Sequence, residues 1–331
     1  MNKKYIIPLI ISLIFCVLVY KRPSKVDDVE NITLYAASDS GEDTVTSIFM
    51  NIFADKVYEL SEGKIKIETY ASGTVGGDLE LLEACKYGNV NFVFQTSAVQ
   101  TSLVKEAEVF DIPSFFDDIN QARDIIDNKL YPKLEKSYAD ADYVLLGISD
   151  QRFRLMTSNK PVNKIEDFRG IRIRTMESAS HIKLWRSLGA NPTPMSYSEV
   201  YVGLQQGTID AQENPLESII APRFYEQQDY LIETNHLLHP VICIGSKKVF
   251  DQLPEAYQKI IRQASIEAVK ESRDLVDIRN KENLAYIKKK GVEIIDHNPK
   301  LAQEMENKTK DLREEIRSHI GDDLYKSYIG Q

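Results

Sequence analysis

Two pairs of arginines in alternating segments are the residues best suited to chemistry. Arg152 and Arg154 alternate in the first segment, and Arg172 and Arg174 alternate in the second. Because residues two apart in a strand project from the same face, each pair points to one side of its strand. A guanidinium donates two parallel N–H bonds to a carboxylate and keeps its charge when buried. The pattern indicates an anion site, although arginines on exposed edge strands more often serve solubility.

The motifs of common enzyme classes are absent from the sequence. It contains no GxSxG, GxxxxGK[ST], GxGxxG, HExxH or CxxC motif. Of the five histidines only His236 and His239 lie close together, and a surface pair is a commoner interpretation than a metal site. Cys85 and Cys243 lie in apolar segments, which predicts buried side chains rather than a disulfide. We therefore predict a protein that is not an enzyme, with no catalytic residue, metal or cofactor.

The segments that precede the arginines read as an α/β unit. Residues 32–38 and 64–71 predict two strands, and residues 44–63 predict the helix between them. Such a β-α-β unit implies a parallel pair of strands. The alternation of helices and strands continues through a strand at 90–97 to another at 142–149.

A second unit begins near residue 151, with a strand at 170–175 and a helix at 178–189. Later in the chain, residues 255–290 contain neither Gly nor Pro and carry apolar side chains at helical spacing. A continuous helix of that length would be about 54 Å long, more than the width of one small lobe. It either spans two lobes or is broken into two. A chain of 331 residues also predicts two lobes around one cleft.

The N-terminal segment predicts export. Two lysines precede an apolar run of about 16 residues, which is marginal for spanning a bilayer. Residues 1–23 are therefore either a signal peptide or an N-terminal membrane anchor, and residues 24–30 form a linker. The formal charge is −9, and it becomes −13 without residues 1–22. Such a surface repels nucleic acid, so an anionic ligand requires local positive charge inside a cleft.

Two long segments carry a resemblance to a known family. They are RLMTSNKPVNKIEDFRGIRIRT (154–175) and LGANPTPMSYSEVYVGLQQGTIDAQENPL (188–216). They resemble the solute-binding subunit of tripartite ATP-independent periplasmic (TRAP) transporters, of the type that binds dicarboxylates and sialic acid. The similarity extends from about residue 31 to 320 and includes segment 64–84 and the long helix.

The resemblance implies an α/β, periplasmic-binding-protein-like (type II) fold of two lobes braced by the long helix. We expect lobe I to comprise residues 31–150 plus 240–279, and lobe II to comprise residues 151–239 plus 280–331.

The resemblance also implies roles for individual residues. Arg174 matches the arginine that clamps the substrate carboxylate, and Arg154 matches a second basic position. Asn214 matches a ligand-contacting asparagine, and Tyr197 matches an aromatic residue that covers the carbon chain. Arg152, which alternates with Arg154, is a further candidate.

The segment after residue 90 departs from the family's sialic-acid binders. Thr96 and Val99 stand where those relatives have an acidic residue and an arginine. This difference argues against sialic acid. Gln95, Thr96 and Ser97 offer neutral polar groups instead, and Asp39 offers contacts to hydroxyls. A sugar acid such as a uronate or aldonate, or a C4-dicarboxylate, fits better.

We therefore expect an extracytoplasmic solute-binding protein that closes its lobes around a small organic carboxylate and delivers it to TRAP membrane permease subunits. Closure would be a population shift, because the ligand bridges both lobes only in the closed state. Two alternatives stay open, namely a binding protein of an ATP-driven importer or sensor, and an exported α/β enzyme.

Overall fold

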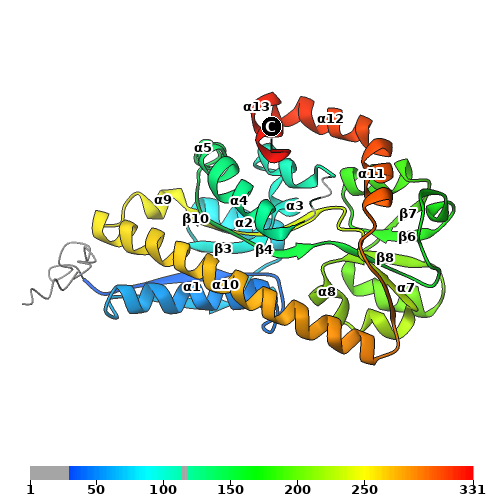
Figure 1. Ribbon diagram of the computed structural model, residues 1–331. Coiled ribbons are helices and arrows are strands. Elements are labelled where there is room, and N and C mark those ends of the chain that lie inside the picture. The colour runs from blue at the N-terminus through cyan, green and yellow to red at the C-terminus, as the bar shows by residue number, and fades with distance from the viewer. Residues whose placement is uncertain (1–29, 114–115, 117, 331) are drawn as a thin grey trace, which may run out of the picture.

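Two β-sheets lie side by side in the computed structural model, which describes residues 30–113, 116 and 118–330 (Figure 1). The first sheet has the strand order β2-β1-β3-β10-β4. Its strands are β1 (Ile32–Ala37), β2 (Ile65–Tyr70), β3 (Phe92–Thr96), β4 (Tyr143–Phe153) and β10 (Leu238–Ser246). β1 pairs in parallel with β2 and β3, which confirms the predicted β-α-β unit, whereas β10 runs antiparallel to β3 and β4.

The second sheet has the order β11-β9-β5-β8-β6-β7. Its strands are β5 (Leu155–Ser158), β6 (Arg172–Thr175), β7 (Asn191–Pro194), β8 (Ala211–Asn214), β9 (Tyr230–Ile232) and β11 (Glu293–Ile295). The chain changes sheet three times: through Arg154 between β4 and β5, between β9 and β10, and again between β10 and β11. The first two crossings place polar residues where the two sheets meet. The division of the chain into lobe I and lobe II stays a prediction.

Helices cover both sheets (Figure 1). They are α1 (Val45–Leu60), α2 (Asp78–Tyr87), α3 (Ser97–Gln100), α4 (Ile119–Ile125), α5 (Tyr131–Asp140), α6 (Ala179–Ser187), α7 (Val200–Gln205), α8 (Leu216–Ile220), α9 (Lys247–Phe250), α10 (Glu255–Lys289), α11 (Pro299–Lys308), α12 (Lys310–Ile320) and α13 (Asp322–Tyr328). Trp185 of α6 is fully buried, as are Cys85 and Cys243, whose thiols are free. The three side chains are therefore core residues, as predicted for the two cysteines.

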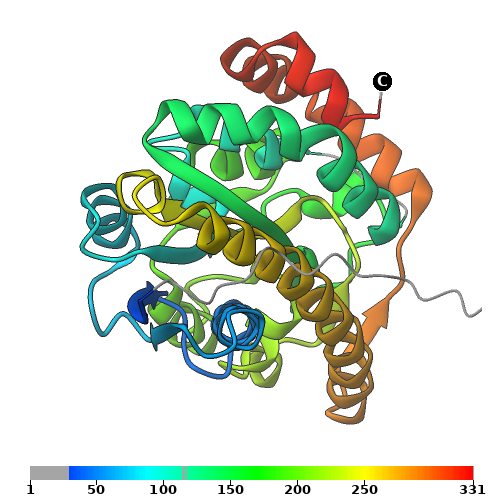
Figure 2. The same cartoon turned by 90° about the vertical axis from the view of Figure 1, so that its left-hand side faces the viewer.

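The long segment is a single helix, α10, of 35 residues. Its first half packs beside α1 through apolar residues such as Ile261 and Ala264 (Figure 2). Its second half contributes Leu284 and Ile287 to the apolar cluster of the second sheet. At about 1.5 Å per residue the helix extends about 52 Å. The helix thus braces both sheets, which confirms the first of the two predicted possibilities.

The C-terminal helices return across the molecule. Tyr328 of α13 is buried and packs edge-to-face against Phe110 and Phe116. His319 of α12 contacts Glu108. No helix of the described residues is long and apolar enough to cross a membrane. The predicted leader (1–23) and the predicted linker (24–30), apart from residue 30, lie outside the described residues.

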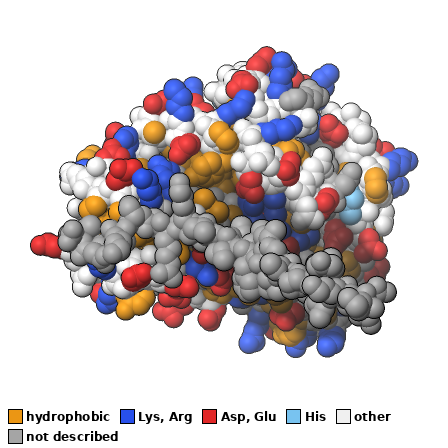
Figure 3. Space-filling view, turned by 60° about the vertical axis from the view of Figure 1, so that its left-hand side comes forward, with side chains coloured by type: hydrophobic (Ala, Val, Ile, Leu, Met, Phe, Trp, Pro, Cys, Tyr) orange, Lys and Arg blue, Asp and Glu red, His pale blue; other side chains and the backbone are white. Residues whose placement is uncertain are grey.

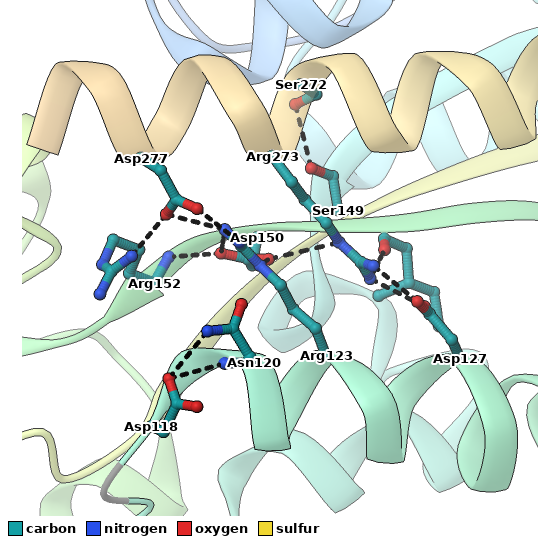
Figure 4. Close-up of polar contacts among 11 residues, drawn as sticks. Asp118, Asn120, Arg123, Asp127, Ser149, Asp150, Arg152, Ser272, Arg273 and Asp277 are labelled. Atoms are coloured by element: carbon teal, nitrogen blue, oxygen red, sulfur yellow. Dashed lines mark hydrogen bonds and ion pairs between the residues drawn. The ribbon is translucent and has the colours of Figure 1, made fainter.

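A charged network ties the end of β4 to α10 (Figure 4). Arg123 of α4 donates to both oxygens of the buried Asp150, at 2.8 and 3.1 Å. The same guanidinium donates to Asp277 of α10, which also pairs with Arg152. Arg152 has a left-handed backbone with φ of 63°. On the face shown in Figure 3, acidic and basic side chains are interspersed.

We expect Asp150→Asn to lower the free energy of unfolding by about 2 kcal/mol, because hydrogen bonds to a charged group contribute about 1.5–3 kcal/mol. Asp277→Asn is the matched control and should cost less, since its carboxylate is partly exposed. Urea denaturation of both variants measures the difference. An equal or larger loss for Asp277→Asn would contradict the assignment of Asp150 as the centre of the network.

Candidate functional site

A small cavity lies where the two sheets meet. Thr96 and Ser97 contribute to it from the end of β3, and Arg154 contributes from the crossing segment. Met176 and His181 contribute from the segment that follows β6. The fold therefore brings the predicted residues Thr96, Ser97 and Arg154 to one cavity, although they come from different segments of the chain.

Arg174 is buried near this junction without an acidic partner in contact. Its side chain is 3% exposed, and its Nε and Nη2 donate to the carbonyl oxygen of Met195 at 3.1 and 2.8 Å. Within the described part of the chain, no carboxylate forms an ion pair with it. Burial lowers the pKa of Arg174 to about 10, and the positive charge of Arg154 adds to that lowering, against the attraction of Glu213. The guanidinium thus has hydrogen-bond donors, and the protein leaves its positive charge without a counter-charge.

Arg154, by contrast, is fully engaged by the protein. Its Nε and Nη2 donate to the two carboxylate oxygens of Glu213 at 2.5 and 2.9 Å. Nη2 also donates to Asn214 Oδ1 at 3.1 Å, and Nη1 contacts His239 Nδ1 at 2.9 Å. β5 pairs antiparallel with β8, which sets these residues next to one another. Glu213 therefore neutralises the charge that the sequence suggested Arg154 would offer to a ligand.

Glu213 lies at the centre of a buried group of basic side chains. Besides Arg154, it contacts His236 Nε2 at 2.9 Å and His181 Nδ1 at 3.6 Å. Burial would raise its pKa, but Arg154 and the two histidines hold it well below the usual range. The interpretation of His236 and His239 as a surface pair was wrong. His236 is fully buried, and His239, in β10, is half-buried and lines the cavity.

His181 lies in the first turn of α6 between two carboxylates. Its Nε2 is 3.5 Å from Asp111 Oδ1, and its Nδ1 has no hydrogen-bond partner in the described structure. Burial would lower the pKa of His181, but Asp111 and Glu213 outweigh burial and raise the pKa to about 9. The sequence analysis did not identify this residue; its place in the helix that follows the strand of Arg174 was the available signal.

His181 predicts a pH dependence of stability. Because its pKa is raised above the unfolded value of 6.5, its contribution is fully present below about pH 6.5 and is lost as the pH rises through about 9. We expect the free energy of unfolding of the wild type to fall over this range. In the His181→Gln variant it should fall less, because the contribution of the imidazole is absent. Urea denaturation at pH 6.5 and 9.5 measures it. Identical slopes for the two proteins would contradict the prediction.

Asn214 and Tyr197 lie in the second sheet and beside it. Asn214 Nδ2 donates to Gln212 Oε1 at 2.7 Å, and its Oδ1 accepts from Arg154. Both ends of the amide are therefore hydrogen-bonded. The Tyr197 side chain is 45% exposed; its hydroxyl donates to the carbonyl oxygen of Ser218, and its ring packs edge-to-face on Phe224. Burial raises the pKa of Tyr197 to about 12, against the positive charge of Arg174.

Gln95 and Asp39 lie at the end of the first sheet. Gln95 Nε2 donates to the carbonyl and the carboxylate of Asp78, whereas its buried Oε1 has no partner in the described structure. Asp39 is exposed next to Asp78 and Gly73. Arg152 is placed elsewhere, in the network with Asp277. The predicted residues are thus distributed over three places. These are the junction of the two sheets, the area beside that junction and, for Arg152, the charged network between β4 and α10.

Two sheets joined by crossing strands and a shared helix, with a buried unpaired cation near their junction, define a two-lobe solute-binding protein. The sequence profile of the bacterial extracellular solute-binding proteins, family 7, matches residues 36–319. The chain belongs to this family, whose members include the solute-binding subunits of TRAP transporters.

Individual relatives agree with this assignment. A solute-binding protein of Verminephrobacter eiseniae is 32% identical over 76% of this chain and 75% of its own length. The sugar-acid-binding protein of Advenella mimigardefordensis, solved with galactonate, has 28% identity and a TM-score of 0.82, over 92% of this chain and 98% of that one. A TRAP periplasmic solute-binding protein of Sulfurospirillum deleyianum, solved with succinate, has 28% identity and a TM-score of 0.79, over 91% and 99%.

Proposed function

We propose that this protein is an extracytoplasmic receptor that binds a small organic carboxylate between its two sheets and delivers it to TRAP membrane permease subunits. The observation that carries the proposal is Arg174, a buried guanidinium whose only hydrogen-bond partner among the described residues is a neutral carbonyl. A buried charge is costly unless a counter-charge and hydrogen bonds satisfy it. A ligand carboxylate supplies both through two parallel N–H bonds.

The other groups near Arg174 suit binding rather than bond cleavage. Arg154 and Glu213 neutralise one another, so neither is free to act as an acid or base. Tyr197 offers a partly exposed aromatic ring. Relatives solved with galactonate and succinate have the same fold, and both ligands are organic carboxylates.

Titration calorimetry tests the proposal by comparing organic acids with uncharged analogues of the same size. We expect galactonate or another small carboxylate to bind with micromolar affinity, about −8 kcal/mol, and the corresponding polyols to bind far more weakly. A carboxylate that binds should also raise the melting temperature through mass action. Equal affinity for acids and polyols, or no binding by any acid, would contradict the proposal.

A further inference from the structure

The buried charges at the junction of the sheets nearly cancel. Arg154 is paired with Glu213 at 2.5 Å, and His181 lies 3.5 Å from Asp111. The flanking carboxylates favour the charged form of His181, as its raised pKa also indicates. After these two pairs are counted, the guanidinium of Arg174 remains as one surplus positive charge.

The nearby histidines do not alter this balance. His236 contacts the Glu213 carboxylate, and His239 Nδ1 lies 2.9 Å from the Arg154 guanidinium, so it can only accept a hydrogen bond there. Burial lowers the pKa of both imidazoles, and the charge of Arg154 adds to this lowering. Both are neutral near pH 7. The junction can therefore neutralise one negative charge on a ligand.

The wall formed by the ends of β1 and β3, in the first sheet, has a different chemistry. Thr96 and Ser97 line the cavity with hydroxyl groups. The adjacent Gln95 is 2% exposed, and its Oε1 is an acceptor without a partner in the described structure. Its Nε2 is bound to Asp78, beside Asp39. This wall offers hydrogen-bond acceptors and negative charge.

The two carboxylates on this wall interact electrostatically. Burial and the charge of Asp39 raise the pKa of Asp78 to about 6, so Asp78 is largely ionised at pH 7. Gly73, with φ of 63°, allows the chain to approach Asp39, because an added Cβ would lie 2.5 Å from Asp39 Oδ1. A second ligand carboxylate placed here would meet like charge, whereas hydroxyl groups would donate to these oxygens.

We propose that the ligand is a polyhydroxylated acid with a single carboxylate, held by Arg174 at the carboxylate end and by the wall of Gln95, Thr96, Ser97 and Asp78 at the hydroxyl end. This inference rests on the proposed function and selects the sugar monoacids over the dicarboxylates within it. One surplus cation matches one carboxylate, and a second carboxylate would be desolvated without a counter-charge.

Matched ligands that differ in the number of carboxylates test the inference. We would titrate the wild-type protein with galactonate, gluconate, galacturonate, glucuronate and erythronate, and with their diacid counterparts galactarate, glucarate and tartrate, together with succinate. We expect the tightest ligand to be a hydroxylated monoacid and its diacid to bind at least tenfold more weakly. A diacid or succinate as the tightest ligand would overturn the inference and leave the proposed function standing. If no acid in this panel binds, both fail.

A variant tests the role of the acidic wall. Asp78→Asn keeps an acceptor for Gln95 but removes one negative charge, so the ratio of diacid to monoacid dissociation constants should fall several-fold. Glu83→Gln is the matched control, since it removes one charge from an exposed position of the same helix, and it should leave the ratio unchanged. An unchanged ratio in Asp78→Asn, or an equal fall in both variants, would overturn the assignment of this wall.

Discussion

The Arg174→Ala variant is expected to lose carboxylate binding while retaining the fold. Two charge-assisted hydrogen bonds contribute about 1.5–3 kcal/mol each, so their loss weakens binding by at least about a hundredfold. Titration calorimetry with the tightest carboxylate ligand of the wild type measures this effect. The ligand-free variant should be as stable as the wild type or more stable, because it no longer buries an uncompensated charge.

Two further variants make this result specific. Arg172→Ala removes a guanidinium from the same strand, but that side chain is half exposed and paired with Asp210, so ligand affinity should be unchanged. Arg174→Lys keeps the charge without the planar pair of donors and should recover only part of the affinity. Wild-type affinity in Arg174→Ala would refute the assignment of Arg174 as the carboxylate clamp.

The Glu213→Ala variant is expected to show the largest loss of stability, about 3–5 kcal/mol in the free energy of unfolding. Glu213 is completely buried and compensates Arg154, while also contacting His181 and His236. Its removal leaves Arg154 buried without a counter-charge. Urea denaturation at pH 7, followed by circular dichroism, measures the loss.

A matched exposed glutamate provides the control. Glu226 forms a surface ion pair with Arg223, and Glu226→Gln should change stability by less than about 0.5 kcal/mol. Glu213→Gln should fall between the control and Glu213→Ala, because the amide retains an acceptor but loses the charge. If Glu213→Ala were as stable as Glu226→Gln, the buried group of charges would not contribute to folding as described.

Much of the fold followed from periodicity in the sequence. Long amphipathic segments such as 255–290 and alternating strands such as 64–71 are determined by local patterns, and the structure contains both elements. β8 was not predicted, because its sequence AQEN has no apolar alternation although all four residues are buried. Several of its polar residues bond to side chains of other segments, such as Arg154 and Thr157. Local sequence patterns do not reveal such partners.

Contacts between distant segments also limited what could be predicted of the site. The arginine pattern and the family resemblance identified Arg174 as a candidate, and the structure shows it buried. Arg154, by contrast, is bonded to Glu213 and His239, which lie 59 and 85 residues away along the chain. His181 also acquires its two carboxylate neighbours from other segments of the chain. Charge compensation of this kind becomes visible only when the chain has been folded.

The backbone of Arg152 has a kinetic consequence. A left-handed conformation at a residue other than glycine costs about 1–3 kcal/mol, and here it is held by bonds to Asp150 and Asp277. The chain changes sheet directly after this residue, so rotation of one sheet against the other would strain the same dihedral angle and the same bonds. The lifetime of a captured solute would then depend on side chains that never touch it.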